Sequence, residues 1–136
     1  MNLRAFIAWA RQAARLVEIG RPVSSDLELA RLVSALEGRA VLFPALVGFP
    51  GWRAISGVCA QREHFAAALG CHVPELVERL AQAMAQPSPP PLEREGPCQE
   101  VSEGHVDLTR LPIPRYHPQD GGRYVTAGVL ILEDPE

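Results

Sequence analysis

The pattern of apolar and polar residues predicts two amphipathic helices in the first part of the chain. From residue 3 to residue 17, apolar side chains recur every three or four positions, with most arginines on the opposite side. Asn2 is placed to cap this helix, and Gly20 is predicted to end it. A second apolar stripe predicts a helix over residues 24–37, which opens on Ser24-Ser25-Asp26. Hydroxyl and carboxylate side chains in this position favour a helix cap over an acidic site.

Two short strands and two further helices are predicted next. Residues 40–43 form an apolar run typical of a buried strand, and residues 52–60 alternate as a second strand. Helical spacing returns over residues 61–69, which Gly70 ends, and over residues 75–86. The glycines of this region do not have the spacing of a phosphate-binding loop. This order predicts a helix-rich α/β domain.

A stiff connector separates this domain from a segment of different character. Residues 87–97 begin Pro-Ser-Pro-Pro-Pro, which favours an extended chain over a helix or a central strand. Beyond it we predict a short strand at 98–101, a Pro-rich loop at 111–119 and a strand at 123–132. Both faces of the last strand are largely apolar, so it is predicted to be buried on both sides. Gly128 leaves room for a cofactor on one face of that strand.

Composition and charge exclude several classes of function. The 136 residues are 47% hydrophobic and 21% charged, which is typical of a globular domain. The net charge of −3 gives no electrostatic footprint for nucleic acid or an anionic membrane. No run of about 18 apolar residues predicts a membrane span, and arginines interrupt any secretory signal, so we predict a cytoplasmic location. All 13 basic residues are arginine, which excludes a Schiff-base or P-loop lysine within this chain.

Scattered histidines and cysteines do not predict a metal centre in the first domain. Cys59, Cys71 and Cys98 lack Cys-x-x-Cys spacing and are predicted to be reduced thiols. His64 and Cys71-His72 flank one predicted helix, and these residues with the distant Cys59 are too few ligands at useful spacings for structural zinc. His64 is predicted to be a partly exposed helix residue.

Two interpretations are open for the histidines and aspartates of the second segment, His105, Asp107, His117 and Asp120. Two imidazoles and two carboxylates near a Gly-Gly turn are suited to a divalent-metal site or an acid–base pair. Asp107 and Asp120 are also suited to capping loops through hydrogen bonds to nearby N–H groups, and this second interpretation is favoured.

Motifs in both halves of the chain carry a family resemblance. In the second half they are Pro97-Cys98-Gln99, Val106-Asp107-Leu108, Leu111-Pro112-Ile113-Pro114, Asp120-Gly121-Gly122-Arg123-Tyr124-Val125-Thr126 and Asp134-Pro135-Glu136. In the first half they are Leu3-Arg4-Ala5-Phe6, Asp26-Leu27-Glu28-Leu29 and Val41-Leu42-Phe43. Together they resemble the UbiD family of reversible decarboxylases over nearly the full chain.

The resemblance implies a fold in two parts. UbiD-type enzymes have an N-terminal α/β domain, a central split β-barrel that binds prenylated flavin mononucleotide (prenylated FMN), and a C-terminal oligomerisation domain. By resemblance, residues 1–86 are the N-terminal α/β domain and residues 87–97 the Pro-rich connector. Residues 98–136 are then the start of the split β-barrel, cut short after its first strand. Thr126 lies on that strand and is the residue predicted to stand beside the flavin.

The resemblance also implies which site residues the chain does not contain. In the family, an Asn and an Arg just after the Asp-Pro-Glu turn hold the flavin and a divalent metal (Mn or Mg), and a catalytic Glu-Arg-Glu set comes later. None of these positions lies within residues 1–136. We therefore predict no catalytic and no metal-binding residue, and we expect the chain alone to be inactive and to bind prenylated FMN weakly.

Three hypotheses follow for function. The resemblance favours the N-terminal portion of a non-oxidative carboxy-lyase that acts on unsaturated or aromatic carboxylic acids. An alternative is a short non-catalytic binding or assembly module that completes a separate catalytic chain, and a third is a stand-alone small-molecule-binding domain. The expected partners are the remainder of the parent enzyme, or a second copy bound through the apolar strand at 123–132. Neither the substrate nor the oligomeric state follows from the sequence.

Overall fold

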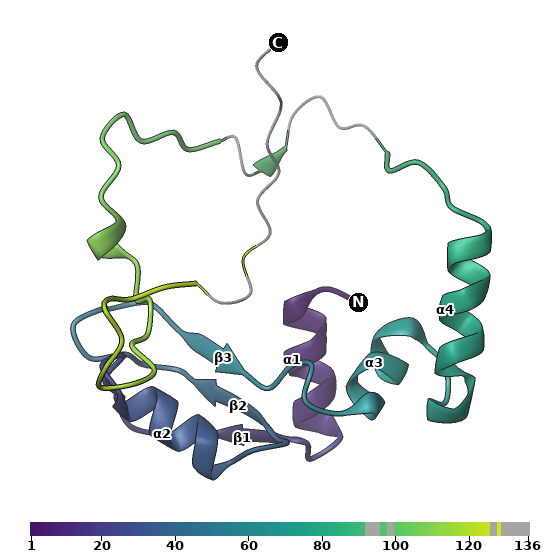
Figure 1. Ribbon diagram of the computed structural model, residues 1–136, viewed down its shortest axis with the longest axis horizontal. Coiled ribbons are helices and arrows are strands. Elements are labelled where there is room, and N and C mark those ends of the chain that lie inside the picture. Colours follow the sequence, from purple (N-terminus) through teal and green to yellow (C-terminus); the bar gives the residue numbers. More distant parts are fainter. Residues whose placement is uncertain (92–95, 98–99, 126–127, 129–136) are drawn as a thin grey trace.

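The computed structural model describes residues 1–91, 96–97, 100–125 and 128. This part contains four α-helices and a small three-stranded sheet, so the predicted helix-rich α/β character is confirmed (Figure 1). The helices are α1 (Leu3–Gln12), α2 (Glu28–Ala35), α3 (Arg62–Leu69) and α4 (Leu76–Ala85), and the strands are β1 (Leu16–Glu18), β2 (Ala40–Phe43) and β3 (Ala54–Ser56). Two short 3-10 turns, η1 (Val73–Glu75) and η3 (Leu108–Arg110), accompany them. No helix in these residues is long and apolar enough to cross a membrane.

The sheet has β2 in the middle, with β1 and β3 at its edges. β1 runs parallel to β2, and its register pairs Val17 with Val41. β3 runs antiparallel to β2 and pairs Ile55 with Leu42. Parallel neighbours need a crossover connection, and α2 supplies it between β1 and β2.

The prediction that the first helix extends to Gly20 is wrong. Asn2 caps α1 as predicted, since its Oδ1 accepts a hydrogen bond from the Ala5 N–H at 2.9 Å, but α1 ends at Gln12. Ala14 then adopts a left-handed backbone with φ of 54°. The apolar residues that follow pair with β2 instead, because a strand partner outweighs helical spacing that extends only one more turn.

The second helix and the second strand are shorter than predicted. α2 begins at Glu28, because Leu27 has φ of 65° and separates residues 24–27 from the helix. We name residues 24–27 the Ser25 turn. Two of its N–H groups are bonded locally: the Ser24 Oγ accepts from Asp26 at 3.1 Å, and Glu28 accepts from Ser24 at 2.8 Å. The predicted strand at 52–60 is reduced to β3, three residues long.

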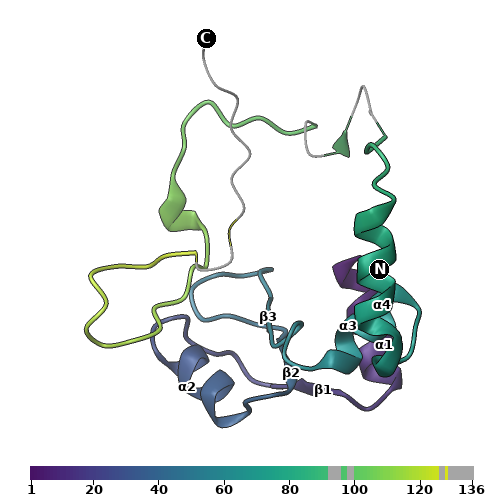
Figure 2. The same cartoon turned by 45° about the vertical axis from the view of Figure 1, so that its right-hand side comes forward.

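β2 lies between two helical layers, one on each face of the sheet (Figure 2). All four of its residues are buried, and successive side chains point to opposite faces. On one face Val41 and Phe43 pack against α2, in a cluster of Val23, Leu29, Val41, Phe43 and Leu46. On the other face Ala40 packs against α1, in a cluster of Phe6, Ala10 and Ala40. Complete burial of a side chain such as Phe43 contributes roughly 1.5–3 kcal/mol.

The second half of this domain follows the predicted order of elements. Gly70 ends α3 in a left-handed conformation with φ of 65°, as the sequence indicated. The first turn before α4 contains a proline and is closed by Glu75, which accepts the His72 N–H at 2.8 Å. Residues 87–91 contain no helix or strand, which agrees with the predicted extended connector.

The two strands predicted beyond the connector are not observed where the chain is described. Glu100 and Val101 are not in a strand, and neither are residues 123–125. A strand needs a partner for its backbone groups, and the described residues offer these segments none. Gly128 is described and is not in a strand, and the other residues of both predicted strands, including Cys98 and Thr126, lie outside the described residues.

Gly57 should be the glycine least tolerant of substitution. It follows β3 with φ of 72°, and a Cβ there would lie 2.0 Å from the carbonyl oxygen of Arg39. Gly57→Ala combines backbone strain with a clash against backbone and should lower the free energy of unfolding by about 2–5 kcal/mol. Urea denaturation measures this change.

Gly48→Ala is the matched control for that substitution. Gly48 has φ of 79°, but a Cβ added there would meet nothing within 4 Å, so only the backbone strain of about 1–2 kcal/mol applies. If the two substitutions lowered the free energy of unfolding equally, the close approach of Gly57 to Arg39 would make no contribution to stability.

Candidate functional site

Residues 111–125, which we name the docked segment, return from the far end of the chain to the Ser25 turn at the start of α2. The backbone of Arg115 makes two hydrogen bonds there. Its N–H donates to the Ser25 carbonyl at 2.9 Å, and its carbonyl accepts from the Leu27 N–H at 3.1 Å. Asp26 and Arg115 thereby form an isolated parallel bridge. A short stretch of backbone pairing therefore attaches the docked segment to the first domain.

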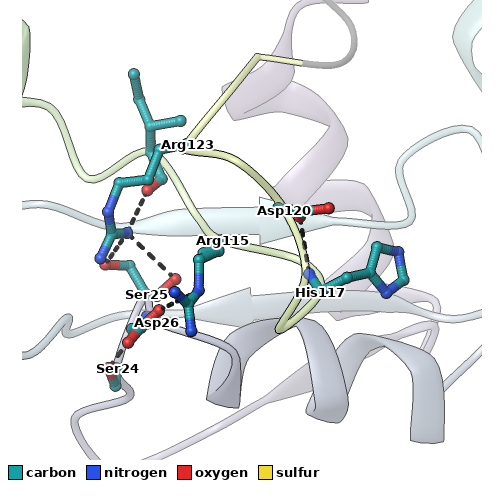
Figure 3. Close-up of polar contacts among 8 residues, drawn as sticks. Ser24, Ser25, Asp26, Arg115, His117, Asp120 and Arg123 are labelled. Carbon is teal, nitrogen blue, oxygen red and sulfur yellow. Dashed lines mark hydrogen bonds and ion pairs between the residues drawn. The ribbon is translucent and has the colours of Figure 1, made fainter.

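An ion pair lies beside this bridge. The Arg115 Nε atom is 2.9 Å from the Asp26 Oδ1 atom (Figure 3). Nε is buried, yet it makes no hydrogen bond within the described residues, so the contact is an ion pair whose N–H is not directed at the carboxylate. With the Asp26 side chain 50% exposed, such a pair contributes little to stability.

Arg123 makes the second set of contacts to the Ser25 turn. Its Nη1 donates to the Ser25 Oγ at 3.1 Å and approaches the Ser25 carbonyl at 3.4 Å (Figure 3). The same nitrogen donates to the carbonyl of Ile113, within the docked segment. Ser25 is only 3% exposed, so its hydroxyl is a buried acceptor that this guanidinium satisfies. One arginine thus joins residues that are 98 positions apart.

An open apolar groove borders the docked segment. Its lining is mainly aromatic, proline and aliphatic: Trp52, Leu111, Pro112, Ile113, Pro114, Tyr116, Tyr124 and Val125. The rings of Tyr116 and Tyr124 contact each other with centroids 6.0 Å apart. Trp52 comes from the loop between β2 and β3 and is 45% exposed. The groove therefore lies where the docked segment meets the first domain.

The aspartates of the second segment cap turns, which confirms the favoured interpretation. The Asp107 Oδ1 accepts from the Thr109 N–H at 2.9 Å and from the Thr109 hydroxyl at 2.6 Å. Asp120 accepts the His117 N–H at 2.8 Å. The described residues bring no three His, Cys, Asp or Glu side chains together in a metal-binding group. His105 is exposed.

The prediction that His64 is partly exposed is wrong. Its exposed fraction is 2%, and its ring meets the edges of Phe6 and Trp9 at centroid distances of 5.3 and 5.9 Å. The Nδ1 atom lies 3.2 Å from the Val58 carbonyl, which gives the buried ring a polar partner. His64 occupies a core position because α3 turns that side towards α1. Cys59 and Cys71 are free thiols, as predicted.

Sequence reasoning missed the contacts of Arg115 and Arg123. The sequence predicts a helix cap at Ser24-Ser25-Asp26, but Leu27 is the N-cap residue of α2 and no side chain caps the helix. Nothing in local spacing indicates a partner 98 residues away. Thr126, the residue predicted to stand beside the flavin, lies outside the described residues. It follows Arg123 by three positions.

The hydroxyl of Thr109 should control the titration of Asp107. Hydrogen bonds from the Thr109 hydroxyl and N–H hold the pKa of the Asp107 carboxyl below its usual value. Thr109→Val should raise that pKa, whereas Thr109→Ser, which keeps the hydroxyl, should not. The carboxyl carbon shift of Asp107, followed by NMR against pH, measures both.

The direction of the pKa shift fixes the pH dependence of this turn. Because the folded pKa is depressed, the stabilisation is present above the ordinary aspartate pKa and is lost as the pH falls through the folded value. If Thr109→Val left the pKa of Asp107 unchanged, and Mn²⁺ broadened the signals of Asp107 and His105, the metal-site interpretation would be supported instead.

Comparison with known proteins places both halves of the chain in one family. Residues 7–84 match the model of the 3-octaprenyl-4-hydroxybenzoate carboxy-lyase N-terminal domain, and residues 91–136 match that of the Rift-related domain of the same enzyme. Anhydromevalonate phosphate decarboxylase of Methanosarcina mazei is 32% identical over 133 residues, which cover 98% of this chain and 30% of that protein. Pyrrole-2-carboxylic acid decarboxylase of Pseudomonas aeruginosa is 32% identical over 155 aligned residues, with 100% of this chain and 31% of that protein covered.

A solved structure gives the same result for the fold. The evolved dimeric form of the UbiD-class enzyme HmfF from Pelotomaculum thermopropionicum, in complex with prFMN, superposes with a TM-score of 0.88 at 32% identity. The match covers 98% of this chain and 32% of that chain. The chain thus spans less than a third of the length of each of these relatives. With both halves matched in sequence and in fold, the chain belongs to the UbiD family of carboxy-lyases.

Proposed function

We propose that this chain forms the first part of a UbiD-type decarboxylase that removes or adds CO₂ at unsaturated or aromatic carboxylic acids. The observation that carries this proposal is the superposition on a UbiD-class enzyme in complex with prFMN over 98% of the chain. Two relatives, named as decarboxylases of a pyrrole carboxylic acid and of anhydromevalonate phosphate, support the reaction type. Because the chain spans under a third of these relatives, the activity is proposed for the longer protein.

The proposal assigns a role to each part of the chain. Residues 1–86 form the N-terminal α/β domain, residues 87–97 connect it, and residues 98–136 begin a split β-barrel that binds prenylated FMN. Thr126 is proposed to stand beside the flavin on the first barrel strand. The partners are the remainder of the enzyme and a small carboxylic acid, and the proposed location is the cytoplasm.

The residues described here do not form a complete flavin or metal site. No three metal-binding side chains come together among them, and the apolar groove beside Trp52 is open. A divalent metal with prenylated FMN would need carboxylate or other oxygen ligands and an anchor for the phosphate. We therefore propose that the groups which hold both, and which deliver protons to the substrate, come from elsewhere in the longer protein.

Flavin titration tests whether the groups that hold the flavin and the metal come from outside residues 1–136. The 136-residue chain should bind prenylated FMN in the presence of Mn²⁺ more weakly than micromolar, whereas the full gene product should bind it tightly. Fluorescence quenching of the flavin on titration measures both affinities. Micromolar or tighter binding by the 136-residue chain would contradict the proposed incompleteness of its site.

Isotope exchange tests the proposed reaction. The full gene product loaded with prenylated FMN and Mn²⁺ should exchange ¹³C-bicarbonate into the carboxyl group of at least one acid in a panel of aromatic and unsaturated carboxylic acids. The same protein without prenylated FMN is the control. A stop codon directly after codon 136 would contradict the proposal and favour the assembly-module alternative.

A further inference from the structure

We infer that Arg123 is a positioning residue: it fixes the direction in which the docked segment leaves the N-terminal domain towards Thr126. The role of Thr126 beside the flavin rests on the proposed function, whereas the positioning of the segment rests on contacts within the described residues. Those contacts involve Arg123, the Ser25 turn and the Gly-Gly sequence that precedes the arginine.

The guanidinium of Arg123 meets acceptors from two separate segments. In the Ser25 turn it donates to the buried Ser25 hydroxyl at 3.1 Å and to the Ser25 carbonyl at 3.4 Å. In the docked segment it donates to the carbonyl of Ile113. Hydrogen bonds from a charged donor are roughly twice as strong as neutral ones. An arginine that spans two segments in this way restricts their relative position as well as their distance.

The residues just before Arg123 cannot provide this restriction themselves. Gly121 and Gly122 have nothing within 4 Å of where a side chain would begin, so no packing holds them. Glycine is the most permissive residue for backbone conformation. Asp120 closes its own turn by accepting the His117 N–H, and that bond links the segment only to itself. The direction of the chain after the glycines therefore depends on the contacts of Arg123 with the Ser25 turn, together with the ring contact between Tyr124 and Tyr116 of the docked segment.

The neighbouring ion pair does not replace this contact. Arg115 holds the middle of the docked segment through two backbone bonds, but it lies before the two glycines. Its Nε–H is not directed at Asp26, which is half exposed. Rotation about the Gly-Gly sequence would leave the Arg115 bonds intact while it moved residues 123–125. Loss of Arg123 should thus free the end of the segment without undocking its middle.

Fluorine NMR of the 136-residue chain, labelled with 5-fluorotryptophan, tests the inference directly. The chain has two tryptophans. Trp52 lines the groove with Tyr124 and Val125, so its resonance reports the position of residues 123–125. Trp9 packs against Phe6 in the core and reports whether the domain stays folded.

Arg123→Ala should move the Trp52 resonance towards that of an exposed indole and leave the Trp9 resonance in place. Amide exchange of residues 123–125 should become about tenfold faster, as expected when a charged hydrogen bond is lost. Arg123→Lys should recover only part of both effects, because the lysine nitrogen ends one bond closer to the backbone than the Nη1 atom that makes all three contacts. Arg79→Ala, which removes an exposed arginine on α4, is the control for the change in charge.

A double-mutant cycle identifies the partner. Ser25→Ala should produce part of the Arg123→Ala effect, and the two together should do no more than Arg123→Ala alone. Unchanged Trp52 shifts and unchanged amide exchange in Arg123→Ala would overturn the inference, and so would fully additive effects.

Flavin binding by the full gene product distinguishes failure of this inference from failure of the proposed function. In the full gene product, Arg123→Ala should weaken the binding of prenylated FMN about tenfold, with partial recovery in Arg123→Lys. Failure of the unsubstituted gene product to bind flavin would overturn the proposed function, while the fluorine shifts would still decide the positioning role. Equal flavin affinity with and without the arginine would overturn the link between Arg123 and the cofactor.

Discussion

Burial of β2 on both of its faces is the constraint on which the rest of the fold depends. A four-residue strand cannot stand alone, so its edges are occupied by β1 and β3 and its faces by helices. Side chains alternate across the strand, and each helical layer therefore receives its own set of anchors, such as Phe43 on one face and Ala40 on the other. Ala40 packs against α1, and Gly57, directly after β3, lies close to the backbone of Arg39, directly before β2.

The Ser25 turn connects this core to the second half of the chain. It lies between β1 and α2, and Val23 next to it is completely buried in the core. Leu27 has a left-handed backbone, which is unfavourable for a residue with a side chain by about 1–2 kcal/mol, and its N–H donates outward to the carbonyl of Arg115. Backbone strain in a folded protein is often associated with functional sites. Here it occurs where the docked segment attaches to a rigid part of the domain.

Local patterns predicted the helices well where a chemical stop signal agreed with the apolar spacing. Asn2 at the start of α1 and Gly70 at the end of α3 show this, since each forms the cap that its residue type favours. β1 was missed because Val17 continues the apolar spacing of the preceding helix, and only the pairing with β2 distinguishes the two conformations. His64 was misjudged because its burial depends on α1, which lies far away in sequence. The caps formed by Asp107 and Asp120 are local and were predicted correctly, whereas the Arg123 contact joins distant residues and was not.

The two modes of attachment in this chain have different physical consequences. Apolar burial holds the N-terminal domain together and is insensitive to the exact direction of each side chain. The docked segment is held mainly by hydrogen bonds around Ser25, which are directional and add little to overall stability. Such contacts are better suited to fixing an orientation than to holding parts together. All basic residues of this chain are arginines, and at position 123 the long side chain has a structural use, because its Nη1 atom reaches acceptors on two segments. The orientation of whatever follows the two glycines thus depends on a few polar atoms that are anchored beside the buried core.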